Sequence, residues 1–518
     1  MYMILSRSSV RITTLAVLVS LLGCLPSVAE HLQQRSPSGN VTNIILLIGD
    51  GMGPQQLALA DMYYQRTNDK RMAALARFLR SATHGTHLSL PERSLVNDSA
   101  CAASQIAGGC RCEPRQVGID VNGKRCASVA LEAKKRGMKV GLVSDTRITH
   151  ATPAAFAAAS RDREYESEIA AQLVESGVDL MLSGGLAFFL PNRELCADPR
   201  CHKAAGPIKF RADGQDLVQE ARRKGFAVAL HKRELEQVQA TPVLGLFAPL
   251  HMNDAFDEGR DDEPSLALMT RKALSLLENP QGFFLMVESG QIDTAAHYND
   301  VGWVFAEMLR LSSMLEEVER FTKTRNDTLV VMTADHETGG MGFSYRNPKQ
   351  SGQKSPTEMG ASGTIDFISP EVYRQLKAQK KTITETVQEF LAQDSKDRTP
   401  EGLGKSLHEN IGVQLSSGTL RTLTELLERP AADAVTDPCS GHSLEQFYPY
   451  PNFHPSAMVA REIAATYGVV WATGTHTSTP VALMAKGPQG ERFAGWHHIR
   501  EVGEKLLTVL AESDGRAR

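Results

Sequence analysis

The chain lacks a large excess of charge of either sign. Its 518 residues carry 56 lysines and arginines against 60 aspartates and glutamates, a net charge of −4. A balance this close to neutral gives no reason to expect nucleic acid or an anionic membrane as a partner. The chain also shows no internal repeat, so a repeat array is not expected. Its 42% hydrophobic content is typical of a soluble globular protein with a large core.

The N-terminus lacks an apolar run long enough to span a bilayer. Residues 12–22 are apolar, follow the basic Arg7 and Arg11, and precede the small-x-small sequence Ser27-Val28-Ala29. This pattern predicts a signal peptide over residues 1–29, and therefore an exported protein, periplasmic or extracellular. The sequence around Cys24 also resembles a bacterial lipobox, so a lipid anchor at Cys24 is the alternative to cleavage after Ala29.

The eight cysteines predict disulfides in an exported chain. Cys196 and Cys201 lie close together and could pair locally. Cys101 falls in a run of small residues and is most simply a buried free thiol. One disulfide is expected within a cluster of three cysteines: Cys110, Cys112 and Cys126.

A buried strand is predicted immediately before Asp50. Residues 44–48 are five apolar residues without a polar break, which is typical of a central parallel strand buried on both faces. The glycines on either side of Asp50 allow a sharp turn at the strand's carboxyl end. Ligands of open α/β sheets bind at this edge, so Asp50 is placed to bind a metal or phosphate. The alternative is that Asp50 only caps the next helix.

Ser99 lies where a helix is expected to begin. Asp98 or Ser99 is a natural N-cap, and the small residues that follow predict a closely packed helix. A helix N-terminus offers free N–H groups and a positive dipole end, which suit an anion. Ser99 is therefore a candidate nucleophile or phosphate contact, and simple capping is the alternative.

Strands and helices alternate along most of the chain. This alternation predicts an α/β fold, a doubly wound and mostly parallel sheet with helices on both faces. The expected strands are 83–88, 139–144, 178–182, 283–287 and 328–333. The expected helices are 55–64, 71–79, 124–136, 168–176, 263–278 and 301–322.

Acidic and histidine side chains follow three of these strands. Glu288 ends one strand, and Asp293 and His297 stand one helical turn apart just after it. Asp335 and His336 follow another strand, Asp50 follows the first, and His476 comes from far away in the sequence. Carboxylate and imidazole ligands together favour zinc, whereas an oxygen-only set favours magnesium.

The alternation breaks between about residues 345 and 455. This stretch is rich in polar residues and contains helical patterns at 371–380, 384–393 and 417–427. We interpret it as a helical insertion on the side of the functional site, within a catalytic domain of residues 40–518. A cap over the site and a dimer contact are its two expected roles.

Together these motifs resemble the alkaline phosphatase family, and they occur in that family's order between residues 43 and 487. The resemblance implies the alkaline-phosphatase-like α/β fold, a crown-like insertion and hydrolysis of small phosphate monoesters. A homodimer is also compatible with it. The motifs are Gly49-Asp50-Gly51-Met52-Gly53, Asp98-Ser99-Ala100, His150-Ala151-Thr152-Pro153-Ala154, Glu288 to His297, Asp335-His336-Glu337-Thr338-Gly339-Gly340, and Gly474-Thr475-His476-Thr477.

The resemblance also implies a role for each site residue. Ser99 is the expected nucleophile, which becomes phosphorylated, and Arg163 the expected phosphate-binding arginine, with Arg161 as its competitor. The implied cofactors are two Zn²⁺ and one Mg²⁺. Their expected ligands are Asp293, His297 and His476 for one zinc, Asp50, Asp335 and His336 for the second, and Asp50, Thr152 and Glu288 for the magnesium.

Two departures from the family pattern and two rival functions remain open. His150 stands where some bacterial members have aspartate, so the metal preference of the third site is open; Thr294 is too short to help bind phosphate. A phosphodiesterase or sulfatase is one rival, and Cys112-Glu113-Pro114-Arg115 comes near a sulfatase motif. A catalytically silent metal- or phosphate-binding protein is the other.

Overall fold

A ten-stranded sheet forms the centre of the computed structural model, which describes residues 40–192, 196, 210–347, 358–359, 365–428, 447–450 and 454–513. Only β15 runs antiparallel to its neighbours. The sheet is therefore mostly parallel, as predicted. Its strands, in spatial order, are β16 (Gly495–His498), β2 (Thr83–Leu88), β15 (Val481–Lys486), β8 (Thr328–Thr333), β1 (Asn43–Gly49), β7 (Phe283–Ser289), β3 (Lys139–Arg147), β4 (Leu180–Gly184), β6 (Val243–Leu246) and β5 (Ala227–Ala229).

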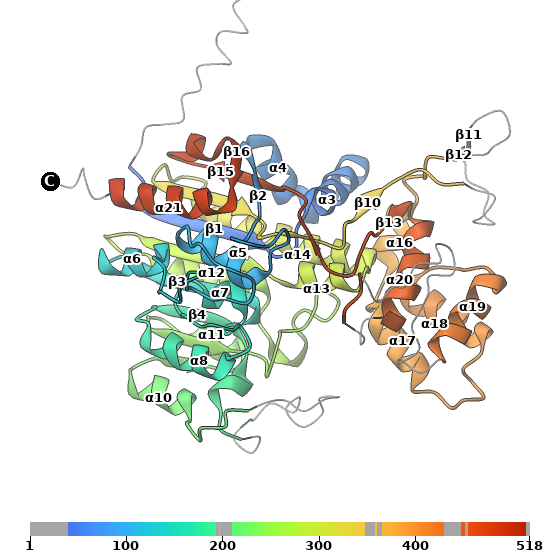
Figure 1. Ribbon diagram of the computed structural model, residues 1–518, viewed down its shortest axis with the longest axis horizontal. Coiled ribbons are helices and arrows are strands. Elements are labelled where there is room, and N and C mark those ends of the chain that lie inside the picture. Colours follow the sequence, from blue (N-terminus) through green and yellow to red (C-terminus); the bar gives the residue numbers. More distant parts are fainter. Residues whose placement is uncertain are drawn as a thin grey trace, which may run out of the picture.

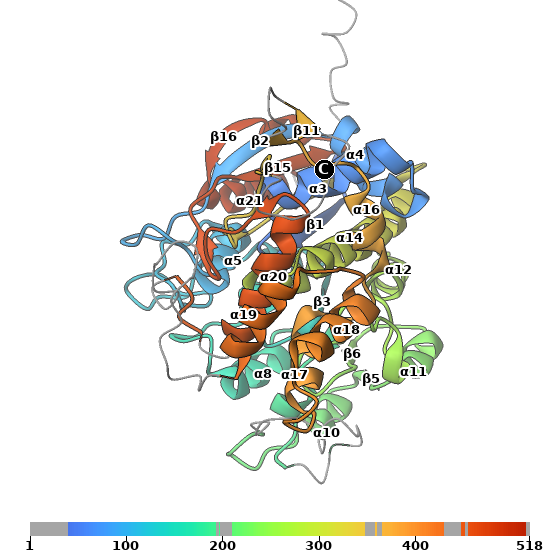
Figure 2. The same cartoon turned by 90° about the vertical axis from the view of Figure 1, so that its right-hand side faces the viewer.

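Helices cover both faces of the sheet, and each face has its own apolar core (Figures 1 and 2). Alternate residues of β1 point to opposite faces: Ile45 and Leu47 enter one core, whereas Leu46 and Ile48 enter the other. This division explains why β1 is an unbroken apolar run. The first core takes residues from α3 (Pro54–Thr67), α4 (Ala73–Ser81), α11 (Lys232–Gln237), α12 (Leu266–Leu277) and α14 (Val301–Thr322); the second from α5 (Ser99–Gly108), α6 (Val129–Lys135), α7 (Ala151–Ala154), α8 (Glu166–Glu175), α10 (Leu217–Arg223) and α21 (Ile499–Ser513).

The register aligns the carboxyl ends of four central strands. Ile48 of β1 lies opposite Glu288 of β7 on one side and Thr333 of β8 on the other. On β3, Ser144 lies opposite Glu288. Because parallel strands end at the same edge, the residues after β1 and β8 meet beside the end of β7.

One predicted helix was wrong at its start. A helix was expected over residues 124–136, but α6 begins at Val129. Arg125 instead forms a β-bridge with Ile119, and Cys126 is bonded to Cys110. Both contacts keep residues 125 and 126 out of the helix. Neither contact can be inferred from the spacing of apolar residues in this segment.

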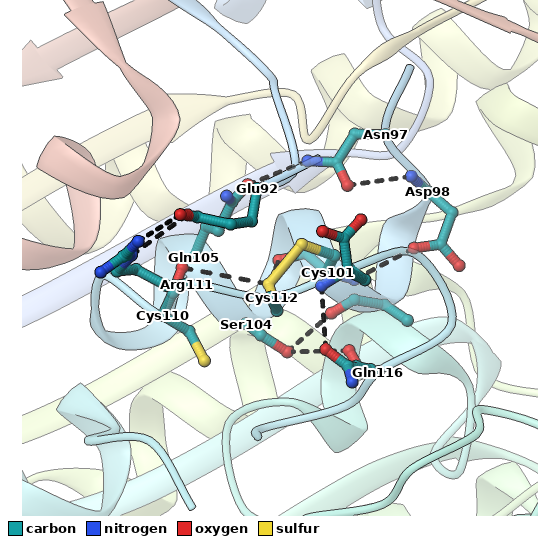
Figure 3. Close-up of a disulfide and its surroundings, with 12 residues drawn as sticks. Glu92, Asn97, Asp98, Cys101, Ser104, Gln105, Cys110, Arg111, Cys112 and Gln116 are labelled. Carbon is teal, nitrogen blue, oxygen red and sulfur yellow. Dashed lines mark hydrogen bonds and ion pairs between the residues drawn. A yellow bond between two sulfur atoms is a disulfide. The ribbon is translucent and has the colours of Figure 1, made fainter. Parts of the chain in front are cut away.

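Two disulfides lie beside α5, one from Cys101 within the helix and one from Cys110 just after its end. Cys110–Cys126 confirms the expected disulfide within the cysteine cluster. The expectation of a free thiol at Cys101 was wrong, because Cys101 is bonded to Cys112 (Figure 3). The sequence indicates that Cys101 is buried in a helix of small residues. It does not indicate that the loop carrying Cys112 packs against that helix. Cys196 is also disulfide-bonded, and its expected partner Cys201 lies outside the described residues, as do the predicted signal peptide and Cys24.

The expected helical insertion contains α16 (Val372–Ala378), α17 (Ile383–Leu391), α18 (Pro400–Ile411), α19 (Ser417–Leu427) and α20 (His454–Thr466). These helices gather beside α13 (Gln291–His297) and α14, at one end of the molecule (Figure 1). Three short ladders accompany them: β9 (Glu337–Thr338) with β14 (His476–Thr477), β10 (Gly342–Phe343) with β13 (Val469–Val470), and β11 (Glu358–Met359) with β12 (Ile365–Asp366). Among the helices within the described ranges, we find none that is long and apolar enough to traverse a lipid bilayer.

Asp300 joins α14 to α17 and to the residues just before α17. Its carboxylate caps α14 by accepting from the N–H of Trp303. It also accepts from the N–H of Ile383 at 2.8 Å and from the amide of Gln379 at 3.0 Å. Asp300 is 1% exposed, so these bonds have no competition from water.

We expect Asp300→Ala to lower the free energy of unfolding by about 2–4 kcal/mol, because it leaves three buried N–H donors without an acceptor. Urea unfolding at constant metal concentration measures this change. Thr399→Ala at the N-cap of α18 removes a single capping bond and is the matched control, with an expected loss of about 1 kcal/mol. Equal losses in the two variants would contradict the linking role of Asp300.

Candidate metal centre

Three groups of side chains that could hold metal ions meet at the carboxyl edge of the sheet. Within each group, the ligand atoms all lie within 4.8 Å of one another. Asp50 belongs to two groups, so the three candidate positions are adjacent. The groups are Asp293, His297 and His476; Asp50, Asp335 and His336; and Asp50, His150 and Glu288.

The first group is assembled from α13 and β14. His297 Nε2 lies 3.2 Å from Asp293 and 3.2 Å from His476 Nε2. The two imidazoles are oriented from behind, since each places its Nδ1 near a backbone carbonyl: His297 at 2.7 Å from Gly474, and His476 at 2.8 Å from Asn97. A carbonyl can only accept, so each Nδ1 carries the proton and each Nε2 lone pair faces the group.

The ladder between β9 and β14 brings His476 to the site. His476 pairs with Thr338, three residues after Asp335. The Thr338 hydroxyl also donates to Asp293 at 2.5 Å. This short ladder therefore connects the first group with the group of Asp50, Asp335 and His336, although their residues are far apart in the sequence.

The second group surrounds the ring of His336. Its Nε2 lies 3.2 Å from Asp335 Oδ2 and 3.6 Å from Asp50 Oδ1. The other oxygen of Asp335 accepts from the N–H of Gly51 at 3.2 Å, across the turn after β1. Gly51 has a φ of +70°, which a residue with a side chain rarely adopts. The turn therefore requires glycine to bring the two aspartates together.

The third group contains Asp50, His150 and Glu288. The hydroxyls of Ser144 and Thr146 both donate to Oε2 of Glu288. Thr152 Oγ1 lies 3.4 Å from Asp50 Oδ2, so this expected ligand also reaches the group.

The carboxylates of the second and third groups repel one another. Burial raises the pKa of Glu288 to about 7, and nearby Asp145 adds to the effect. Burial and the charge of Asp293 raise the pKa of Asp335 to about 7. The pKa of Asp50 is raised well above its usual range, chiefly by burial and then by Asp335.

One oxygen of each of these carboxylates is buried and accepts no hydrogen bond from any described residue: Asp50 Oδ1, Glu288 Oε1 and Asp335 Oδ2. Buried carboxylates without donors are costly unless they pair with a cation. The oxygens that lack donors belong to the groups whose atoms converge. The residues present therefore fit divalent cations.

Ser99 is the first residue of α5 and lies beside the second group. Its Oγ is 3.2 Å from His336 Nε2, and its side chain is buried. Asp98 is the N-cap and accepts from the N–H of Cys101 at 3.1 Å, so capping does not require the Ser99 hydroxyl. Ser99 is therefore available to react at the positive end of the helix.

Arg163 also reaches this edge. One of its terminal nitrogens lies 3.2 Å from Asp98, and the other 2.8 Å from His150 Nε2. Burial opposes the charge of Arg163, but Asp98 and Asp50 outweigh it and raise the pKa, so the guanidinium stays charged. Arg161, its competitor in the sequence analysis, is exposed.

Several residues of the site were assigned no role in the sequence analysis. Ser144, Thr146 and Thr338 orient the carboxylates, and their positions at or just after strand ends were the only available indication. The structure also argues against the sulfatase alternative, because Cys112, the cysteine of the sulfatase-like motif, is bonded in a disulfide.

Comparison with known proteins gives one family. The family model for alkaline phosphatase matches residues 41–414. Alkaline phosphatase 4 of Bacillus subtilis is 28% identical over 92% of this chain and 90% of its own length. The repressible alkaline phosphatase of Saccharomyces cerevisiae is 33% identical over 65% of this chain and 62% of its own.

Solved structures agree with this family. The alkaline phosphatase of Thermus thermophilus superposes with a TM-score of 0.72 at 26% identity, covering 94% of this chain and 99% of its own. The cold-active enzyme of a Shewanella species has the same fold, with a TM-score of 0.70 at 24% identity over 90% of this chain and 99% of its own. The chain thus belongs to the alkaline phosphatase family and is a phosphomonoesterase.

Proposed function

We propose that the protein hydrolyses phosphate monoesters through a phosphoserine intermediate on Ser99, at a site holding two Zn²⁺ and one Mg²⁺. The observation that carries this proposal is the convergence of three ligand groups beside a serine that begins a helix. In this assignment, Asp293, His297 and His476 hold one zinc, and Asp50, Asp335 and His336 hold the other. Asp50, Thr152 and Glu288 hold the magnesium, with His150 beside them.

The choice of metals follows from the donor atoms. Imidazole nitrogen with carboxylate oxygen suits zinc, whereas oxygen donors suit magnesium. When bound, the ions supply positive charge beside the phosphoryl group and lower the pKa of oxygens bound to them.

The reaction divides into two displacements at phosphorus. In the first, Ser99 Oγ forms the new P–O bond while the bond to the alcohol oxygen breaks, and the alcohol leaves with a proton. In the second, water attacks the phosphoserine, releasing phosphate and restoring the Ser99 hydroxyl. The N-terminus of α5 favours negative charge on the serine oxygen and on the phosphoryl group.

Arg163 is the proposed phosphate-binding residue. A guanidinium can donate to two non-bridging oxygens at once and offset their charge. Asp98 holds one side of the guanidinium, which limits its freedom before substrate arrives.

We also propose that the protein works outside the cytoplasm. The two disulfides beside α5 support this, because such bonds persist in oxidising compartments. A periplasmic location, a lipid anchor at Cys24 and a homodimer remain predictions from the sequence.

Removing metal tests the proposal. We expect chelation to abolish hydrolysis of p-nitrophenyl phosphate at alkaline pH, and zinc with magnesium to restore it. Metal analysis should then give two zinc ions and one magnesium ion per chain. Hydrolysis of bis-p-nitrophenyl phosphate in preference to the monoester would instead indicate a phosphodiesterase.

Two serines of α5 test the nucleophile: Ser99 is the proposed nucleophile, and Ser104 in the same helix is the matched control. Ser99→Ala should bind the same metals but lose about 10³-fold or more of kcat, because the nucleophile is gone. Ser104→Ala should keep kcat, since its hydroxyl bonds only backbone groups, those of Ala100, Gln116 and Gly118. Full activity of Ser99→Ala would refute the phosphoserine.

The raised pKa values of Glu288 and Asp335 predict how pH affects the metal-free protein. In the unfolded chain these groups ionise near their ordinary values of 4.5 and 3.8, whereas in the folded state they hold protons up to about pH 7. The stability they contribute is complete below pH 4 and disappears as pH rises through 7. The Tm of the metal-free protein should therefore fall between pH 5 and pH 8.

Calorimetry of the chelated protein measures this fall. Asp335→Asn removes one of the competing charges without changing the shape, so its Tm should fall less over the same range. A metal-free wild-type protein more stable at pH 8 than at pH 5 would count against the repulsion.

A comparison of Arg163 with Arg161 tests the phosphate contact. Arg163→Lys should lower kcat/KM by about 10- to 100-fold, because a charge-assisted hydrogen bond and the fork geometry are lost. Inhibition by inorganic phosphate should weaken in parallel. Arg161→Lys should stay within about twofold of wild type, and the reverse pattern would move the assignment to Arg161.

A further inference from the structure

Exposed apolar side chains flank the group formed by Asp293, His297 and His476. One of them is Tyr450, whose ring meets the ring of His297 edge-on, with centroids 5.7 Å apart at 89°. Tyr450 is 48% exposed, so much of this aromatic surface is open to solvent. A partly exposed aromatic ring is therefore placed against a proposed zinc ligand.

Phe447 lies in the same short segment, and the segment is fixed to the loop that carries His476. The carbonyl of Phe447 accepts from the N–H of Gly474 at 3.0 Å and from the hydroxyl of Thr473 at 2.6 Å. Its side chain is 57% exposed. These bonds attach the backbone of Phe447 to residues 473 and 474, just before His476 in the sequence.

A second apolar pair comes from the chain that leads into Ser99. Leu95 and Val96 are 81% and 42% exposed. The carbonyl of Leu95 accepts from the hydroxyl of Ser478, and the carbonyl of Asn97 faces Nδ1 of His476. The segment around His476 is thus bonded on one side to Phe447, through Thr473 and Gly474, and on the other to Leu95, through Ser478.

The two halves of the site differ in character. Ser99 and Arg163, with Asp98 between them, form a polar half suited to the phosphoryl group. The exposed apolar residues lie instead on segments that contact the group of Asp293, His297 and His476 or its loop. Ser99 Oγ lies beside the second group, and the attacking and leaving oxygens of a phosphoryl transfer are roughly in line. We therefore place the departing alcohol on the side of the first group. Single exposed apolar residues are ordinary, but four of them around one histidine loop need a reason.

We propose that Tyr450, with Phe447, Leu95 and Val96, forms an apolar subsite for the alcohol part of the substrate. The preferred substrates are monoesters of alcohols that carry an aromatic group, which stacks against Tyr450. This inference rests on the proposed function, because that function defines which side of the site the alcohol occupies.

A pair of substrates separates binding from chemistry. Ethyl phosphate and 2-phenylethyl phosphate both release a primary alcohol, and differ mainly in the phenyl group. For the wild-type holoenzyme we expect kcat/KM to be about three- to tenfold higher for 2-phenylethyl phosphate, the range of one aromatic contact. Tyr450→Ala should bring this ratio close to one, whereas Tyr450→Phe should keep it because the ring remains.

Trp496→Ala is the control for loss of an exposed aromatic side chain. Trp496 is 66% exposed on the edge strand β16, far along the sheet from β1, and its variant should keep the wild-type ratio. A wild-type ratio near one, or a ratio that Tyr450→Ala leaves unchanged, would overturn the subsite.

Binding of phosphonates distinguishes failure of the subsite from failure of the proposed function. 2-Phenylethylphosphonate and ethylphosphonate cannot be hydrolysed, so calorimetry compares their affinities without turnover. We expect the phenyl compound to bind about three- to tenfold more tightly, and Tyr450→Ala to remove the difference. Hydrolysis of neither ester would refute the proposed function, and equal phosphonate affinities would refute the subsite.

Discussion

Repulsion between buried carboxylates is the constraint on which the site depends. Asp50, Glu288 and Asp335 are fully buried. Besides burial, Asp335 and Glu288 raise the pKa of Asp50, and Glu288 raises the pKa of Asp335. No packing of apolar side chains relieves this cost, since the register of β8, β1 and β7 fixes where the strands end. The protein is thus built around charges that become favourable only beside cations.

Neutral hydrogen-bond donors around these carboxylates determine which of their oxygens remain available to a cation. Ser144 and Thr146 satisfy one oxygen of Glu288 and leave the other without a donor. Gly51 and the N–H of His336 do the same for Asp335. The free oxygens thereby point to fixed positions, and carbonyls behind His297 and His476 orient those rings in the same way. Such preorganisation means that a ligand atom does not have to reorient when a cation arrives.

The sequence predicted the sheet and the residues at its carboxyl edge because both follow from strong local signals. The apolar run before Asp50, the Asp293–His297 spacing and the placement of Asp335 and His336 after a strand were each visible alone. What was missed depends on contacts between distant segments. The Cys101–Cys112 bond, the late start of α6 and the hydroxyls around Glu288 are set by which loop packs against which strand. The periodicity of apolar residues indicates which face of a segment is buried, but not which other segment packs against that face.

The order of strands in the sheet has a consequence for how the molecule folds. β1 is paired with β7 and β8, whose residues come more than 230 positions later in the sequence. The chain must therefore close loops of that length before its central strand has neighbours, which makes its contact order high and its folding slow. The cation positions do not exist until those loops have closed, because one combines Asp50 with Asp335 and another combines Asp293 with His476. Metal can stabilise the finished fold but cannot nucleate it.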